Sequence, residues 1–186
     1  MKGADSMQTS VDDKVVSLTV RQAKLGDKEA FCTLIRENKN SMYRVAKAIL
    51  NIEEDVEDAI SEAILKAYKG ISKLKDDNFF KTWLIRIVIN ESKTIYKKRM
   101  REIVTEGEVF SKIQVSDSYE DLTLHNAINS LDEELRVTTI LFYFEDMKYK
   151  DIARILDIRE GTVKSRLSRA KSKLFNILKE ELHGEV

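Results

Sequence analysis

A group of short polar and basic side chains recurs on one side of a helix near the end of the chain. Side chains of these types can donate hydrogen bonds to phosphates and to base edges of DNA. The group contains Thr162, Lys164, Ser165, Arg166, Ser168, Arg169 and Lys171. The segment Lys148–Lys173 holds nine Lys or Arg and three acids, a local charge of +6 in a chain of zero net charge. This concentration of charge favours contact with DNA, and the alternative is a solvated basic face on an ordinary helical hairpin.

Apolar residues around this face indicate the elements that position it. A helix that begins near Gly161 places one apolar stripe toward the core and the basic face away from it. That stripe consists of Val163, Leu167, Ala170 and Leu174. A shorter helix upstream has its own stripe, made of Tyr149, Ile152, Ala153 and Leu156. Ala153 lies ten residues before Val163, a spacing typical of helix-turn-helix motifs. The pattern therefore favours a DNA-binding motif over an ordinary hairpin.

A second polar surface is expected on a long helix, Phe80–Arg101. Its members recur at helical spacing and are Arg86, Asn90, Lys93 and Lys97. The basic run at the end of this helix can follow a phosphate backbone, although basic residues there also complement the helix dipole. A polar loop with an aromatic residue lies upstream, and its candidate residues are Leu74, Lys75, Asp76, Asn78 and Trp83. Such a loop can hold an unstacked base, and the alternative is an aromatic core beneath a polar loop.

An acidic helix, Asp55–Tyr68, carries the opposite charge. Six carboxylates lie within residues 53–62, where Lys and Arg are absent. Hard cations need oxygens that converge from irregular backbone, so outward-pointing helical carboxylates do not predict a metal site. No catalytic carboxylate is predicted either, because nothing in the pattern indicates the burial that would separate two pKa values. From the residues alone, a solvated face and a surface that docks another protein both stay open.

The composition predicts an all-α protein. The 186 residues are 34% charged and 42% hydrophobic, with six glycines and no proline, which favours helices over sheets. No stretch reaches the roughly 20 apolar residues of a membrane span, and the N-terminal residues lack the centre of a secretory signal. We therefore expect a cytoplasmic protein without direct membrane insertion. Cys32 lies in an apolar helical pattern and is expected to be buried, while His125 and His183 are isolated, so no metal and no cofactor are predicted.

The chain is expected to form two small helical domains joined by a flexible linker. Lost helical periodicity, with Gly, Ser and Thr, indicates the linker. The expected parts are a flexible tail over residues 1–20, a first domain over 21–101, the linker over 102–118 and a second domain over 119–182. The first domain is expected to contain four helices. These are Lys24–Asn38, Met42–Leu50, Asp55–Tyr68 and Phe80–Arg101.

Two segments together resemble the extracytoplasmic-function (ECF) group of bacterial RNA polymerase sigma factors. The first is EEDVEDAISEAILKAYKGI followed by FFKTWLIRIVIN, which is similar to region 2 of that family. The second is LRVTTILFYFEDMKYKDIARILDIREGTVKSRLSRAKSKL, which is similar to region 4. The resemblance covers residues 21–182, and W-L-x-R-I-x-x-N is its most restrictive part. One departure lies in the turn of the second segment, where Arg159 takes a position that is often proline in the family.

The resemblance implies a role for each surface. The acidic helix would dock on the clamp helices of the polymerase β′ subunit through Asp55, Glu57, Asp58, Ile60, Glu62, Ile64 and Leu65. The loop Leu74–Asn78 and the ridge through Asn90 would melt and read the minus-ten element, with a base of the single-stranded non-template strand held in a pocket. The basic face would read the minus-35 element in double-stranded promoter DNA. The polymerase β flap and an anti-sigma factor, often membrane-bound, are further implied partners.

The sequence thus predicts a non-catalytic subunit that binds core RNA polymerase, recognises a bipartite promoter and helps to open it. No small-molecule substrate is expected. A stand-alone helix-turn-helix regulator is the first alternative, and it would bind duplex DNA without polymerase. An enzyme with a metal-dependent site on the acidic helix is the second, and Asp55→Asn with Asp58→Asn would abolish its turnover.

Overall fold

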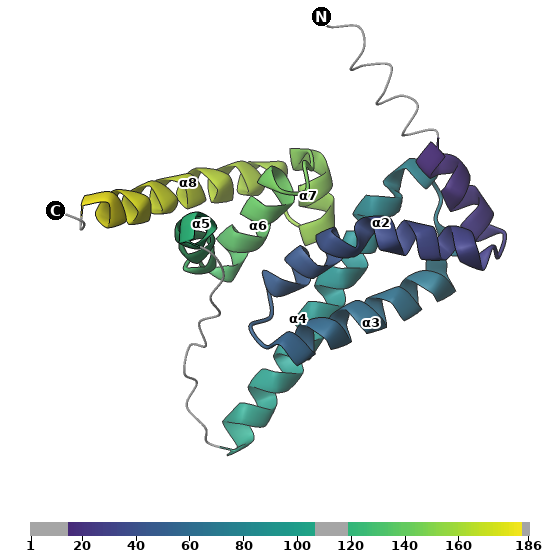
Figure 1. Cartoon of the computed structure of the whole chain (residues 1–186), viewed down its shortest axis with the longest axis horizontal. Coiled ribbons are helices and arrows are strands. Elements are labelled where there is room, and N and C mark those ends of the chain that lie inside the picture. The colour runs from purple at the N-terminus through teal and green to yellow at the C-terminus, as the bar shows by residue number, and fades with distance from the viewer. Residues whose placement is uncertain (1–14, 107–118, 184–186) are drawn as a thin grey trace, which may run out of the picture.

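The computed structural model describes residues 15–106 and 119–183 (Figure 1). Every regular element in these ranges is an α-helix or a short 3-10 helix, so the predicted all-α class is confirmed. After a helix at residues 15–24, the elements are α2 (Lys28–Lys47), α3 (Glu53–Gly70), η1 (Ile71–Lys73), η2 (Asp77–Phe79), α4 (Phe80–Glu106), α5 (Tyr119–Asn129), α6 (Glu133–Tyr143), α7 (Tyr149–Leu156) and α8 (Glu160–His183). Among the described residues, no helix is both long enough and apolar enough to cross a membrane.

The first helical unit consists of the helix at residues 15–24 together with α2, α3 and α4. Small side chains let its helices approach closely, because Ala59, Ala63 and Ala67 recur at every fourth residue of α3 and are completely buried. Leu84 and Val88 on α4 are also completely buried, and α4 packs against both α2 and α3. Close packing of this kind holds α3 and α4 rigidly beside each other, so their outer faces have a fixed relation.

Two boundaries near the N-terminus differ from the sequence-based expectation. Residues 15–24 are helical, so a helix lies partly inside the expected tail, and residues 1–14 lie outside the described part of the chain. α2 continues without a break where two helices were expected. The buried stripe that includes Leu34 resumes at Met42, two helical turns later, so one helix serves both segments.

Two further expectations are corrected by the fold. α4 extends to Glu106, into the expected linker, and residues 107–118 lie outside the described part. Cys32 is exposed, although it was expected to be buried. Its neighbours Phe31 and Leu34 are buried on the inner side of α2, and the 100° turn per residue carries Cys32 to the outer side.

The second helical unit consists of α5 to α8, with α6 packed against α7 and α8. Leu141 on α6 and Val163 on α8 are completely buried in its core. The turn between α7 and α8 passes through Asp157, whose φ of 56° and ψ of 48° are left-handed, a conformation that Asp tolerates better than most residues. The N–H of Ile158 then donates to the carbonyl oxygen of Ala153 at 3.0 Å and closes α7.

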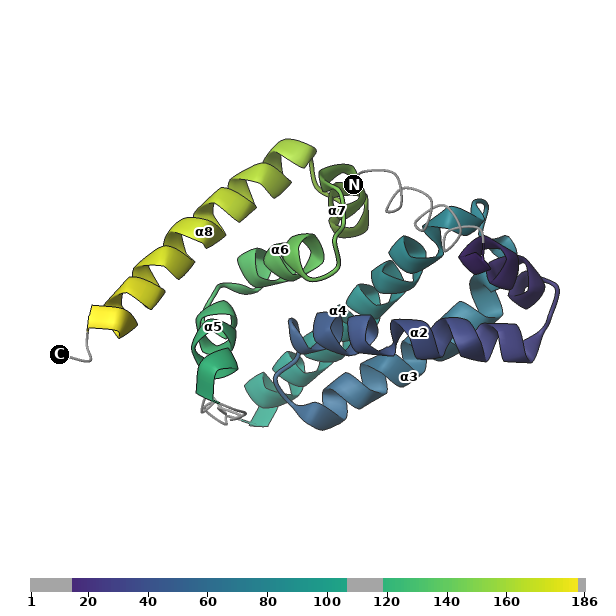
Figure 2. The ribbon, with the colours of Figure 1, turned by 45° about the horizontal axis from the view of Figure 1, so that its top comes forward.

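The two units touch each other along a contact that we call the seam, formed by α2 and α4 of the first unit and α6 and α7 of the second. Figure 2 shows α6 and α7 beside α2 and α4, and residue contacts join α2 to α6 and α4 to α7. Buried apolar residues of both units belong to one continuous cluster. The units are therefore packed together in this structure, an arrangement that the sequence did not predict.

Candidate nucleic-acid interface and docking surface

The predicted recognition surface lies along the first half of α8. Val163, Leu167 and Ala170 point into the core and are at most 8% exposed, which confirms the predicted apolar stripe. Thr162 lies half-buried at the start of the helix. The exposed members of the opposite face are Lys164, Ser165, Ser168, Arg169 and Lys171. The local period of the sequence therefore placed these side chains correctly.

The side chains of this face differ in the contacts that they make within the chain. The hydroxyl of Ser165 donates to the carbonyl oxygen of Thr162 at 3.0 Å, and its lone pairs remain available as acceptors. The ammonium of Lys164 lies 5.7 Å from the ring centroid of Tyr149, a cation–π contact that holds its stem against α7. Arg169 is exposed on the outer side of the helix, and its planar fork suits two parallel hydrogen bonds to a guanine edge.

Arg166 does not share this exposure. Its side chain is only 12% exposed, and Nη2 lies 2.7 Å from Oε2 of Glu134 on α6. Lys173 similarly lies 2.6 Å from Asp132, and this hydrogen bond lowers the pKa of the Asp132 carboxyl from its usual value. The sequence pattern placed Arg166 on the flank of the DNA-facing side, but the structure turns it toward α6. Arg166 thus positions α8 instead of offering a free cation to DNA.

The predicted polar ridge runs along the outer side of α4. Arg86, Asn90 and Lys97 are exposed and Lys93 is half-buried, while Ile85 and Ile89 are buried on the inner side. The spacing of Leu84, Ile87, Val88 and Ile95 predicts the inner face of this helix, and Ile85 and Ile89 are not part of that pattern. Their burial widens the inner face without moving the ridge, so the four polar side chains still share one side of the helix.

The loop before α4 is shaped by the two 3-10 helices η1 and η2. Leu74, which was predicted to contact DNA, is only 9% exposed, and its side chain belongs to the core. Its carbonyl oxygen accepts a hydrogen bond from Lys24 at 2.7 Å. Lys75, Asp76 and Asn78 are exposed, and the carboxylate of Asp76 accepts the N–H of Asn78 at 3.0 Å. This bond fixes the start of η2 and so limits how the loop can move.

Asp77 anchors this loop and was missed by the sequence interpretation. Its carboxylate lies 2.8 Å from Lys24 Nζ and 2.9 Å from Arg21 Nε, both on the helix at residues 15–24. The hydrogen bond from Lys24, opposed by desolvation and supported by Arg21, lowers the pKa of Asp77. The available signal was the i, i+3 spacing of Arg21 and Lys24 on one helix, but nothing local connects it with a residue more than fifty positions away.

Trp83 is half-buried at the junction of α3 and α4. A Cβ at Gly70 would lie 3.2 Å from Cζ2 of Trp83, so the glycine leaves room for the indole. The Phe80 ring also packs near the indole, with centroids 6.0 Å apart. Part of Trp83 therefore packs as a core residue, and the remainder lies beside the polar loop. Both earlier interpretations of this aromatic residue describe part of it.

The acidic side of α3 is exposed, with one exception. Glu57, Asp58, Glu62 and Leu65 are exposed, and Ile60 and Ile64 are half-buried beside them. Asp55 is the exception, because Arg99 on α4 donates to its two oxygens at 2.9 and 3.1 Å and its side chain is 13% exposed. This contact raises the pKa of Arg99 above its usual value. Asp55 was predicted to dock a partner, but the structure uses it to join α3 to α4.

Tyr68 extends the exposed side of α3 and was not among the predicted docking residues. It is 46% exposed and lies one helical turn beyond Leu65, which is 52% exposed. Its ring also makes an edge contact with Phe31, with centroids 5.1 Å apart. The surface thus combines carboxylates with apolar side chains, a composition more typical of a protein interface than of a purely solvated face.

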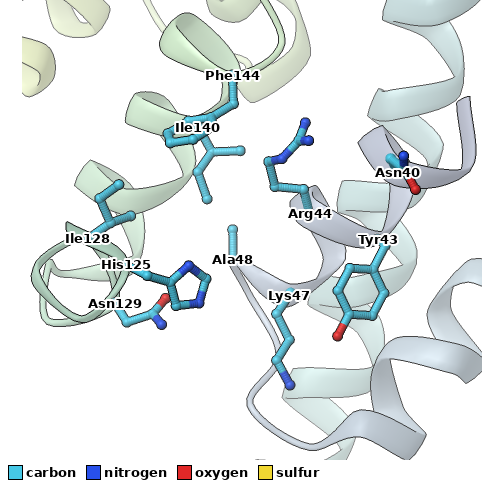
Figure 3. A pocket seen from close by; sticks show the side chains of 10 residues that line it. All are labelled: Asn40, Tyr43, Arg44, Lys47, Ala48, His125, Ile128, Asn129, Ile140 and Phe144. Carbon is cyan, nitrogen blue, oxygen red and sulfur yellow. The ribbon is translucent and has the colours of Figure 1, made fainter. Parts of the chain in front are cut away.

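A cavity of about 300 Å³ opens at the seam, between α2 on one side and α5 and α6 on the other (Figure 3). Its basic lining residues are Arg44, Lys47 and His125, and Phe144 and Ile140 supply apolar walls. The guanidinium of Arg136 closes the seam nearby, donating to the carbonyl oxygen of Ala48 at 2.7 Å. Burial lowers the pKa of Arg136 from its usual value. Over the described ranges, no cluster of three His, Cys, Asp or Glu could hold a metal ion.

Family models match both halves of the chain. The model described as Sigma-70 region 2 matches residues 34–102, and the one described as Sigma-70, region 4 matches residues 121–174. The chain belongs to the ECF group of sigma-70 factors. The first match contains α3, the loop after it and most of α4, and the second contains α7 and the first part of α8. Both halves thus match the regions of the family that the sequence suggested, in the same order.

Characterised sigma factors are similar over nearly the whole chain. The RNA polymerase sigma-H factor of Pseudomonas aeruginosa is 29% identical over 82% of this chain and 88% of its own length. The ECF RNA polymerase sigma-E factor of Escherichia coli K12 is 28% identical over 91% of this chain and 96% of its own length. As a member of the ECF group, this protein is a sigma factor, which directs RNA polymerase to promoters. The alternative of a stand-alone regulator is not favoured.

Solved structures share the fold. The sigma factor RpoE of Bartonella quintana, in complex with the anti-sigma factor NepR, has a TM-score of 0.72 at 25% identity and covers 80% of this chain and 96% of its own. CnrH, in complex with the cytosolic domain of CnrY, has a TM-score of 0.66 at 21% identity, with 88% and 97% covered. The similarity to CnrH concerns the fold alone.

Proposed function

We propose that the exposed surfaces of this sigma factor divide its work. α3 docks core RNA polymerase, α4 and the loop before it capture the minus-ten element, and α8 reads the minus-35 element. The separation of charge carries this proposal, because the acidic side of α3 and the basic side of α8 are both exposed on different units of a chain with zero net charge. The polymerase performs the covalent chemistry, so this chain acts as a non-catalytic subunit in the cytoplasm.

Base recognition in the minus-35 element is assigned to Lys164, Ser165, Ser168 and Arg169. They are exposed on one side of α8, while the opposite stripe is buried, so the helix can enter a major groove without losing its core. Lys171 lies on the flank of this face and suits a phosphate. Thr162 lies in the first turn of α8, where backbone N–H groups also favour phosphate oxygens.

Capture of the minus-ten element is assigned to the α4 ridge and the adjoining loop. The ridge residues Arg86, Asn90, Lys93 and Lys97 supply charge and hydrogen bonds, and Trp83 supplies an aromatic edge. In the loop, the exposed residues are Lys75, Asp76 and Asn78. Stacking and hydrogen bonding of unpaired bases stabilise the melted strand, so this surface favours promoter opening.

Docking on the β′ clamp helices is assigned to the outer side of α3. Glu57, Asp58 and Glu62 provide charge, and Leu65 provides exposed apolar area beside the half-buried Ile60 and Ile64. The second unit would contact the β flap. Two modules on one polymerase raise each other's effective concentration, so modest affinities of each surface combine into tight promoter binding.

An anti-sigma factor is proposed as a further partner. The sigma factor of Bartonella quintana, 25% identical to this chain, is bound by the anti-sigma factor NepR in its solved structure. A shared fold over most of both chains supports the same kind of partner here.

A reconstituted transcription assay tests the docking assignment. Wild-type chain with bacterial core polymerase is expected to initiate on promoter fragments that core polymerase alone does not use. Reversing three charges by Glu57→Lys, Asp58→Lys and Glu62→Lys should abolish initiation, because the docking surface then repels its partner. The control is Glu37→Lys on the exposed side of α2, which should behave as wild type. Equal activity of the triple variant and the control would contradict the assignment.

Two substitutions on α8 separate base contacts from phosphate contacts. Arg169→Ala should relax selectivity at the minus-35 element by about 1–3 kcal/mol, and Lys171→Ala should weaken binding evenly and reduce the salt slope by about 0.9. Binding of the holoenzyme to matched and mismatched promoter DNA at several salt concentrations measures both effects. An equal loss on matched and mismatched DNA for both variants would overturn the assignment of this face.

A further inference from the structure

A buried carboxylate joins the two helical units. Glu145, in the connection between α6 and α7, has a side chain with 0% exposure. Its partners both come from the first unit: Arg44 on α2 donates to Oε1, and Lys81 on α4 lies 3.0 Å from Oε2 in an ion pair without hydrogen-bond geometry. A charge removed from water needs such partners, so in the packed arrangement Glu145 depends on Arg44 and Lys81.

The partners of Glu145 differ from it in exposure. The side chains of Arg44 and Lys81 are 39% and 44% exposed, so each reaches water in the packed arrangement. If the units separated, all three charged groups would be hydrated and the apolar part of the seam would be exposed. The balance between the packed and separated arrangements therefore depends on the Glu145 contact together with the apolar part of the seam.

The packed arrangement also places α7 beside the end of the loop assigned to the minus-ten element. Arg154 on α7 lies 5.2 Å from the ring centroid of Phe79, which immediately follows Asn78 at the end of η2. α7 packs on α4 as well. A DNA strand that approaches Phe79 from this side would therefore meet α7.

The distance between the two promoter elements is also too large for the packed arrangement. Their names place them about 25 base pairs apart, or roughly 85 Å along the duplex at 3.4 Å per pair. A compact chain of 186 residues has a radius of gyration of about 16 Å. With α7 held on α4, the adjoining α8 cannot be displaced far enough to read one element while α4 reads the other.

We propose that Glu145 is a latch that holds the two units closed, and that the latch must open before both promoter elements can be bound. The functional consequence rests on the proposed sigma-factor surfaces, whereas the closed arrangement can be tested without DNA or polymerase. Opening separates Glu145 from Arg44 and Lys81 and uncovers Phe79. Binding of polymerase to both units would supply the free energy for this step.

Energy transfer between two dyes tests the latch. One dye is attached to Cys32 on α2, the single cysteine of the chain, and the other to Ser172→Cys on α8, both at exposed positions. Glu145→Gln removes the charge of the latch and should raise the ratio of open to closed chains by about tenfold or more. Arg44→Ala with Lys81→Ala changes partly exposed side chains of the first unit and should open the chain at least as strongly, even if Glu145→Gln folds poorly.

The matched control is Lys66→Ala, which removes the partner of Glu91 inside the first unit and should leave the energy transfer unchanged. Unchanged transfer in Glu145→Gln and in Arg44→Ala with Lys81→Ala would overturn the latch. An equal drop in the control would overturn it too, because the signal would then report general loosening.

Transcription by the same variants separates the latch from the proposed function. Opened variants should reach half-maximal initiation at lower chain concentration than wild type, and an unchanged concentration would overturn the requirement for opening. Loss of energy transfer without transcription by any form, wild type included, would contradict the sigma-factor surfaces and leave the closed arrangement supported. Normal transcription with unchanged energy transfer would support the sigma-factor surfaces and contradict the latch.

Discussion

The loop assigned to the minus-ten element depends on one carboxylate, and Asp77→Asn is expected to loosen it. Asp77 is 13% exposed and is bound by Lys24, which is 24% exposed, and by Arg21, which is 67% exposed. A hydrogen bond between charged groups contributes about 1.5–3 kcal/mol when shielded, and an exposed ion pair about 0.2–1 kcal/mol. The asparagine amide still accepts a hydrogen bond, so we expect a net loss of about 1–2 kcal/mol in the free energy of unfolding.

The sign of the pH dependence follows from the lowered pKa of Asp77, whose largest cause is the hydrogen bond from Lys24. The carboxylate of the unfolded chain titrates near a pKa of about 3.9. Because the folded-state pKa lies below that value, the contribution of Asp77 is fully present above the unfolded pKa and is lost as pH falls through the folded pKa. The difference between wild type and Asp77→Asn should therefore be constant from pH 8 to about pH 5 and shrink below about pH 4.

Urea unfolding followed by Trp83 fluorescence measures this effect, since Trp83 is the single tryptophan and lies in the first unit. The control is Asp58→Asn, an exposed carboxylate on α3. A gap that persists unchanged at pH 3 would show that the ion pairs are not its cause. Equal destabilisation by both variants would refute the anchoring role. If the reasoning holds, Asp77→Asn should also impair promoter opening while sparing assembly with polymerase.

Three more outcomes are expected, each with its own measurement. Arg99→Ala leaves the poorly exposed Asp55 without its bidentate partner and should lower the urea stability of the first unit by about 1–2 kcal/mol. Gly70→Ala pushes the indole of Trp83, because the new Cβ would lie 3.2 Å from it, and should shift the fluorescence maximum while retaining helical circular dichroism. Leu141→Ala empties a completely buried position of α6 and should cost about 2.7–5 kcal/mol, measured as an earlier thermal loss of helical signal and of promoter binding.

α8 shows how much of a helix surface can be predicted from the spacing of residues in the sequence. The stripe through Val163 and Ala170 was readable because a helix repeats every 3.6 residues whatever packs against it. The same spacing placed Arg169 on the outer side correctly. It failed for Arg166, which lies at the edge between the two faces, because only the position of Glu134 on α6 decides which way that long side chain turns.

The loop before α4 shows more plainly what local sequence patterns cannot predict. Its composition indicated polar surface, yet Leu74 is part of the core and Asp77 is the anchor. The contact of Asp77 with Lys24 spans 53 residues, so no periodicity within either segment contains it. The contact of Asp55 was not predicted for the same reason, since its partner Arg99 lies 44 residues away on another helix.

The sequence by itself determined the all-α class, the apolar stripes and the exposed charged sides of α3, α4 and α8, because helical period and composition act over a few residues. The tertiary structure alone decided which charged residues remain available to partners. Arg166, Asp55 and Asp77 are held inside the chain by contacts between helices, and Glu145 meets Arg44 across 101 residues. Such contacts depend on how complete helices pack, and packing is set by the whole set of buried side chains instead of by any local pattern.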